Sequence, residues 1–134
     1  MGQQQILLIV LGVIIVSLAV VVGIYVFGAA HDESIKDELV TQCMAIGMNA
    51  QQFFLKPIGM GGGENTFVSG GPGNAGYVIP VRMRTTSNGS YIESSKTDTT
   101  FTIIATPNTI PGKTYSFSNV TAVVTPTTIR TTIN

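Results

Sequence analysis

The stretch that decides the fold is ILLIVLGVIIVSLAVVVGIYVF, which runs from Ile6 to Phe27. Only Gly12, Ser17, Gly23 and Tyr25 interrupt this run of apolar side chains. As an α-helix it would be about 33 Å long, enough to cross a hydrocarbon layer of about 30 Å. A lone strand in lipid would leave its backbone unpaired, whereas a helix pairs it internally. We therefore predict a helix that inserts in a membrane.

This run is longer than the core of a signal peptide, which has about 7–15 residues. No small-residue cleavage motif follows it, because Phe27-Gly28-Ala29-Ala30 is a poor match. We therefore expect the apolar run to remain part of the protein.

Charged residues are scarce and unevenly placed. The 134 residues include seven basic and seven acidic side chains, and none of them, nor a histidine, precedes His31. This balance provides no electrostatic case for a nucleic-acid partner. The single cysteine, Cys43, excludes an intramolecular disulfide and a cysteine-based zinc site.

Small residues recur along one side of the predicted helix. Gly12, Ala19, Gly23 and Ala30 are separated by seven, four and seven positions, which places them on one stripe. Such a stripe lets helices approach closely in an apolar medium. The alternative reading is that glycine and alanine are simply common in membrane helices.

A second helical pattern covers residues 31–56. Its apolar residues recur at spacings of three and four, which is typical of an amphipathic helix; they are Ile35, Leu39, Cys43, Ile46, Ala50, Phe53 and Phe54. Pro57 ends the pattern. We predict one helix over about residues 3–56, with a break after Gly28 and a new helix capped by Asp32 as the alternative. Cys43 is predicted to be a buried structural thiol.

The passage PIGMGGGENTF, residues 57–67, is superficially similar to a phosphate-binding loop. It lacks the GK[ST] ending and follows a helix rather than a strand. We interpret it as a connector that turns the chain back onto the helix.

Short β-type runs then alternate with turn signals. They are Thr66–Val68, Tyr77–Thr85, Ser90–Ser94, Thr100–Thr106, Tyr115–Phe117, Val120–Val124 and Thr127–Ile133, with a two-residue hairpin turn expected at Asn88-Gly89.

The predicted fold class is α+β: a long N-terminal hydrophobic helix with a small C-terminal antiparallel sheet of about four strands packed on its second half. One face of the sheet would be apolar and packed on Phe53 and Phe54, and the other would be rich in Thr and Ser. Three parts are expected: a hydrophobic helix (1–30), an amphipathic extension (31–56), and a glycine-rich connector with a threonine-rich β-domain (57–134).

No arrangement of acids, bases or nucleophiles indicates catalysis. His31 is interpreted as a solvated or headgroup-level residue, and Glu64, Glu93 and Asp98 have no partnering motif. We expect no enzymatic activity, no cofactor and no metal. Asn88 and Asn119 each begin a sequon for N-glycosylation, although chance sequons are common in a threonine-rich chain.

Two passages resemble the type IV pilin family. QILLIVLGVIIV, residues 5–16, is similar to the start of such pilins, which typically read FTLIELLIV. AQQFFLKPIGMGGGENTF, residues 50–67, resembles a group of short bacterial pilin-like proteins that share an aromatic–Lys–Pro and polyglycine passage. The resemblance is specific over residues 1–67 and architectural beyond them.

The resemblance implies a non-enzymatic subunit that waits in the inner membrane. Pilus assembly machinery would then build it into an extracellular homopolymer, with apolar helices at the filament core. The chain departs from the family in three ways. A leader cut after Gly2 would be Met-Gly alone, without a basic residue; the glutamate typical of position five in the mature chain is absent; and no C-terminal disulfide exists. We expect Met1 to be retained, and Gln3, Gln4 and Gln5 to set register between subunits.

Two rival interpretations stay open. The chain would be a minor pseudopilin of a secretion apparatus if it formed a short periplasmic piston. It would be a binding module if a monomeric, membrane-anchored β-domain captured a ligand.

Overall fold

The computed structural model describes residues 2–68 and 76–134, in two compact units. The first unit ends at Ser34, and the second runs from Ile35 to Asn134. The long helix α1, Gly2–Leu55, contributes to both units, which are considered separately below. Its bounds agree with the prediction of a helix over residues 3–56, and Pro57 follows its last turn.

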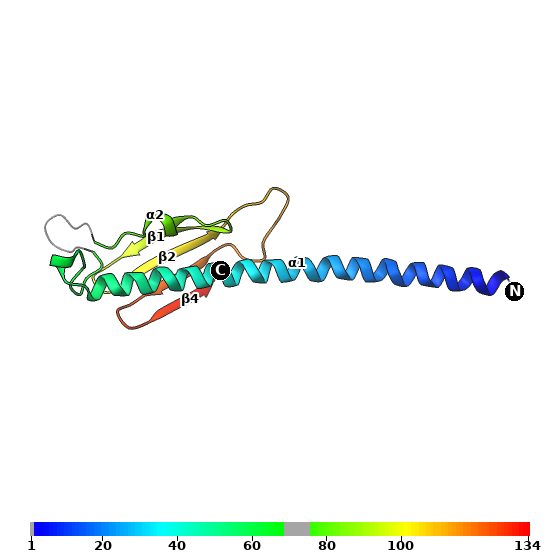
Figure 1. Ribbon diagram of the computed structural model, residues 1–134, viewed down its shortest axis with the longest axis horizontal. Coiled ribbons are helices and arrows are strands. Elements are labelled where there is room, and N and C mark those ends of the chain that lie inside the picture. Colours follow the sequence, from blue (N-terminus) through cyan, green and yellow to red (C-terminus); the bar gives the residue numbers. More distant parts are fainter. Residues whose placement is uncertain (1, 69–75) are drawn as a thin grey trace. The chain divides into compact units, whose positions relative to one another are not determined.

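The second unit contains a four-stranded antiparallel sheet (Figure 1). Its strands are β1 (Gly89–Lys96), β2 (Phe101–Pro107), β3 (Val120–Val124) and β4 (Ile129–Ile133), paired in chain order. The α+β class and the four antiparallel strands are confirmed. From β2 onward each strand pairs with the one before it, so the sheet is a simple meander. Short loops, residues 97–100 and 125–128, join β1 to β2 and β3 to β4, whereas residues 108–119 join β2 to β3.

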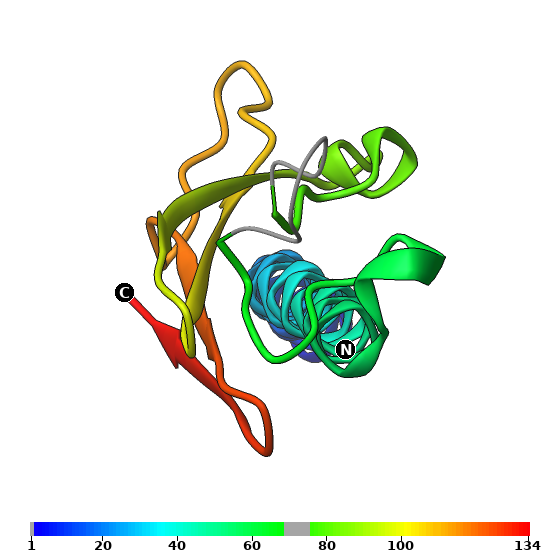
Figure 2. The same ribbon diagram turned by 90° about the vertical axis from the view of Figure 1, so that its left-hand side faces the viewer.

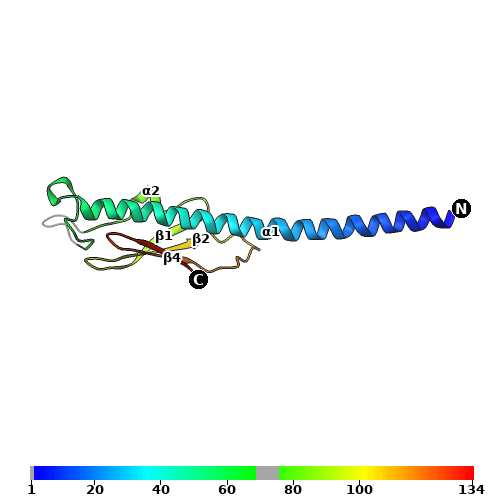
Figure 3. The same ribbon diagram turned by 90° about the horizontal axis from the view of Figure 1, so that it is seen from below.

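One face of the sheet packs on residues 35–55 of α1, so helix and sheet form two layers (Figures 2 and 3). Side chains alternate along a strand, and every second residue of β2 and β3 is buried. The helix buries Ile35, Leu39, Cys43, Ile46, Gly47, Ala50 and Phe54. The opposite face of the sheet carries mainly Thr and Ser, but Ile92 lies opposite Ile104 there.

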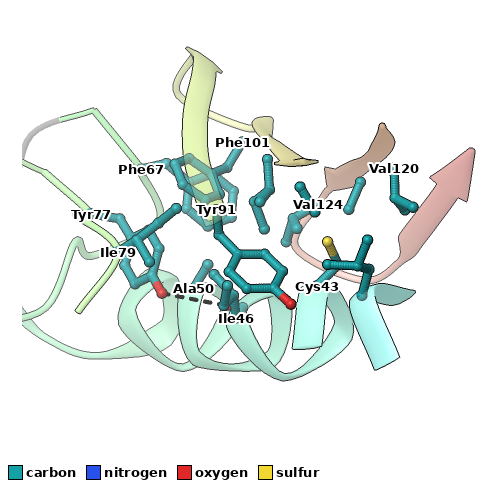
Figure 4. Packing of buried hydrophobic residues seen from close by; sticks show 14 of the residues in the cluster. Cys43, Ile46, Ala50, Phe67, Tyr77, Ile79, Tyr91, Phe101, Val120 and Val124 are labelled. Atoms are coloured by element: carbon teal, nitrogen blue, oxygen red, sulfur yellow. Dashed lines mark hydrogen bonds between the residues drawn. The ribbon is translucent and has the colours of Figure 1, made fainter. Parts of the chain in front are cut away.

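Aromatic rings fill one end of this core (Figure 4). The ring centroids of Phe54 and Phe67 are 4.9 Å apart, and Tyr77 meets Phe101 edge-on at 4.9 Å. The Tyr77 hydroxyl donates to Asn49 Oδ1 at 3.0 Å and to the Ile46 carbonyl at 3.3 Å. These contacts bind the connector segments to the helix.

The glycine-rich connector caps the C-terminus of α1. The backbone N–H of Gly63 donates to the Phe53 carbonyl at 2.8 Å, and that of Asn65 donates to the Phe54 carbonyl at 2.8 Å. A Cβ at Gly62 would collide with the backbone carbonyl of Lys56. The connector therefore satisfies carbonyls that the end of a helix leaves without partners.

The expected extended run Tyr77–Thr85 is wrong over its second half. Val81–Arg84 forms the one-turn helix α2, which follows Pro80 (φ −54°). The N–H of Met83 donates to the Pro80 carbonyl at 2.8 Å, and Arg84 Nε donates to the Ile79 carbonyl at 2.9 Å. The fixed φ of proline suits the start of a helix, and tertiary packing of Met83 on the core adds to that preference.

The turn expected at Asn88-Gly89 lies one residue earlier. The N–H of Thr86 donates to the Gly89 carbonyl at 2.8 Å, so Ser87 and Asn88 form the loop. Gly89 is the first residue of β1, and glycine suits this position because the Leu39 side chain occupies the place of a Cβ. The predictions of strands at Thr66–Val68 and Tyr115–Phe117 are also wrong; Phe67 and Phe117 contribute buried rings from irregular backbone instead.

Candidate functional site: an exposed apolar helical segment

The main candidate site is the apolar segment, defined as Ile6–Phe27 of α1. Its large side chains are half to mostly exposed, from 49 % for Leu11 to 80 % for Tyr25. The helix is long and apolar enough to cross a membrane, with a mean hydropathy of 3.3 over its most apolar window. A surface that is apolar on every side is unfavourable in water, and it suits surroundings of lipid or of other apolar helices.

The backbone and the Ser17 hydroxyl of the apolar segment are hydrogen-bonded within the helix. Its backbone is helical throughout, and Ser17 Oγ donates to the Val13 carbonyl at 2.7 Å. No acidic, basic or histidine side chain occurs in it. Lipid or a bundle of helices would therefore face paired backbone along this stretch, and the exposed Tyr25 hydroxyl lies near its C-terminal end.

The predicted stripe of small residues lies on helical backbone. Gly12, Ala19, Gly23 and Ala30 all belong to α1, so their spacing places them on one side of it. A Cβ added at Gly12 or Gly23 would meet nothing within 4 Å. The rest of the chain therefore does not require glycine at these two positions.

The predicted register residues precede the apolar segment. Gln3, Gln4 and Gln5 are helical and exposed, and the proposed processing position Gly2 is the first residue of α1. Met1, whose retention we expect, lies outside the described residues. The role of the three amides in register stays a prediction.

Cys43 is confirmed as a buried residue of the core. Its side chain is fully buried, and burial raises the pKa of the thiol to about 12. Because the thiolate is the reactive form, the protonated thiol is inert at physiological pH. Cys43 therefore contributes packing rather than chemistry.

The other titratable residues that the sequence singled out are dispersed. His31 is exposed on α1, Asp98 Oδ1 accepts a hydrogen bond from Thr66 at 3.1 Å, and Glu93 lies 3.9 Å from Lys96. Within residues 2–68 and 76–134, no three His, Cys, Asp or Glu side chains gather in a way that could hold a metal ion.

The two sequon asparagines differ in their surroundings. Asn88 is half-buried, and its Nδ2 donates to Glu38 Oε2 of α1, so a glycan at Asn88 would replace that bond. Asn119 Oδ1 accepts from Asn134 Nδ2 at 3.1 Å. Glycosylation at either position stays a prediction.

One feature was not singled out in the sequence: the outer edge of β4. Which strand lies at an edge depends on pairing between distant segments, so the only local signal is that Ile129–Ile133 contains no proline or lysine and one charge, Arg130.

Comparison with known proteins identifies no relative. No protein-family model matches the chain, and no curated protein or solved structure is similar to it.

Proposed function

We propose that the chain is the structural subunit of an extracellular, type IV pilus-like helical filament. The subunit resides in the inner membrane through its apolar segment and polymerises when pilus assembly machinery moves that segment from lipid into a bundle of identical helices. No cofactor takes part. The proposal rests on the pilin-like sequence of residues 1–67 and on the α+β layout.

The observation that carries the proposal is the exposure of the apolar segment on all its sides. None of the residues in its most apolar stretch is buried by the rest of the chain, and a Cβ added at Gly12 or Gly23 would meet nothing within 4 Å. In lipid and in a helix bundle alike the segment is surrounded by apolar groups, so transfer between the two is feasible. Dispersion contacts at small residues then favour the bundle. A head-to-tail contact of this kind repeats without closing.

The test replaces glycines of the small-residue stripe with a larger side chain. We expect Gly12→Leu and Gly23→Leu to abolish fibres in negative-stain images of sheared cells, because a larger side chain keeps neighbouring helices apart. Ser17→Leu is the matched control, since Ser17 lies about 140° around the helix from Gly12. Carbonate extraction should find all three variants in the membrane. Normal fibres from both glycine variants would contradict close packing along this stripe.

Two further outcomes separate the rival functions. A minor pseudopilin would be scarce in sheared surface material, whereas a major subunit would dominate it. A binding module would give detergent-extracted monomers and no fibres. Mass analysis of the N-terminus of any fibre would decide whether Met1 and Gly2 are retained.

A further inference from the structure

The two edge strands of the sheet, β1 and β4, differ in how far other parts of the chain cover them. At the β1 edge, Thr85 bridges to Ser90, α2 packs beside the strand, and the register shifts between Glu93 and Ser95. At the β4 edge, no described residue outside β3 pairs with the backbone of Ile129–Ile133. One edge is thus covered and the other is open.

The hydrogen bonds of β4 define which backbone groups face outward. Asn134 and Asn119 exchange both of their N–H···O bonds, at 2.9 and 3.3 Å, and Thr125 N–H donates to the Thr128 carbonyl at 2.8 Å. In an antiparallel pair such hydrogen-bonded positions recur at every second residue. Ile129, Thr131 and Ile133 therefore direct their N–H and C=O groups away from β3.

β4 carries little protection against pairing. It contains no proline and no lysine, and its register with β3 is regular throughout. Its one charge is Arg130, on the threonine-rich face. Natural edge strands are usually shielded by such devices, and an unshielded one is a template for another strand.

We infer that β4 pairs with β4 of a second copy of this chain, antiparallel and centred on Thr131. The strand IRTTI, residues 129–133, is self-complementary in that register. Thr131 lies opposite Thr131 of the second copy, Ile129 lies opposite Ile133, and Arg130 lies opposite threonine rather than another arginine. No like charges meet, and the three outward-facing residues each exchange both backbone hydrogen bonds with the residue opposite.

The pairing also covers apolar surface. Ile129 packs on the core, and Ile133 is 47 % exposed in the single chain. In the paired sheet Ile133 lies beside Ile129 of the second copy, so the two apolar faces join. Cross-strand pairs of this kind add to the backbone bonds. The contact has a twofold axis and closes on itself, so it is distinct from filament growth through the apolar segment.

The register is tested by disulfide formation in the full chain in detergent micelles. Antiparallel hydrogen-bonded residues have Cα atoms about 5.5 Å apart, which suits a disulfide. We expect Thr131→Cys to form covalent dimers at least about tenfold faster than Arg130→Cys, whose two copies lie diagonally and beyond disulfide reach. Mixing Arg130→Cys with Thr132→Cys should restore rapid dimers. The wild type, with only buried Cys43, is the background.

A second pair of variants tests the backbone contact. Thr131→Pro removes an outward-facing N–H without breaking a bond to β3, whereas Thr131→Val retains that N–H. Both are made in the Gly12→Leu background to weaken association through the apolar segment, and sedimentation measures their size. We expect Thr131→Val to dimerise and Thr131→Pro to be monomeric. Equal crosslinking of Thr131→Cys and Arg130→Cys, or equal dimerisation of the proline and valine variants, would overturn the inference. The crosslinking comparison does not use the Gly12→Leu variant and follows register within β4 alone, so a failure of the filament proposal would leave its result unaffected.

Discussion

Cys43 is a buried structural residue, as its place in the apolar pattern of residues 31–56 predicted. It occupies the apolar face of α1 between Leu39 and Ile46, and the sheet covers it. Burial disfavours the charged thiolate, which is why the thiol pKa rises to about 12. A small apolar side chain would serve the same packing role.

The inertness of this thiol is measurable. In the folded chain we expect no alkylation of Cys43 by iodoacetamide at about pH 8, and complete alkylation after unfolding in guanidinium. Mass spectrometry of the intact chain reads the modification. Met48→Cys is the matched control, because Met48 lies on the same helix and is 56 % exposed. Rapid labelling of native Cys43 would show that the core opens readily.

At the scale of elements, α1 combines two kinds of surface in one helix. Its apolar segment has no polar face, whereas residues 35–55 bury one stripe of side chains under the sheet. The C-terminus of the helix is capped by the connector. Backbone N–H groups of the connector donate hydrogen bonds to the last carbonyls of the helix, and Gly62 lies close to the Lys56 backbone. The glycine passage thus stabilises a helix terminus and returns the chain to the core.

The connector predicts a contrast between two neighbouring glycines. Gly62→Ala should destabilise the second unit by about 1–3 kcal/mol, because the added methyl group forces the capping turn away from α1. Gly59→Ala should have little effect, since a Cβ there meets nothing within 4 Å. Urea unfolding of the full chain in micelles, followed by tyrosine circular dichroism, measures both. Equal stabilities would refute the role of the close approach.

At the scale of the whole molecule, the buried core belongs to the second unit. All of its buried hydrophobic residues lie between Ile35 and Val124, including the phenolic side chains of Tyr77 and Tyr91. Burial raises the pKa of both tyrosines, and the charge of Glu93 raises that of Tyr77 further. Because the pKa values of these two phenols and of the Cys43 thiol are raised in the folded chain, the free energy of unfolding depends on pH in the alkaline range.

The sign of this linkage follows from the raised values. The unfolded chain ionises the thiol near pH 9.0 and the phenols near pH 10.0, before the folded chain does. Their contribution is therefore fully present below pH 9 and is lost as pH rises above it. We expect unfolding free energy to fall by roughly 1 kcal/mol per pH unit for each ionising group. Urea unfolding from about pH 8 to about pH 11 measures the slope, and Tyr77→Phe should reduce it. An unchanged stability over this range would contradict the prediction.

The sequence by itself determined the elements whose signals are local and long. Apolar spacings of three and four located the buried stripe from Ile35 to Phe54, and alternation located β2 and β3, because the side chains of a helix or strand face a core with a fixed period. The one-turn helix after Pro80 combines a local preference of proline with tertiary packing. Tertiary structure alone decided the turn at Ser87-Asn88 and the irregular backbone at Phe67. At these places packing against Leu39 and the core outweighs local propensity. It alone also decided that β4 lies at an open edge, because strand order depends on hydrogen bonds between distant segments, which leave no periodic signal in the chain.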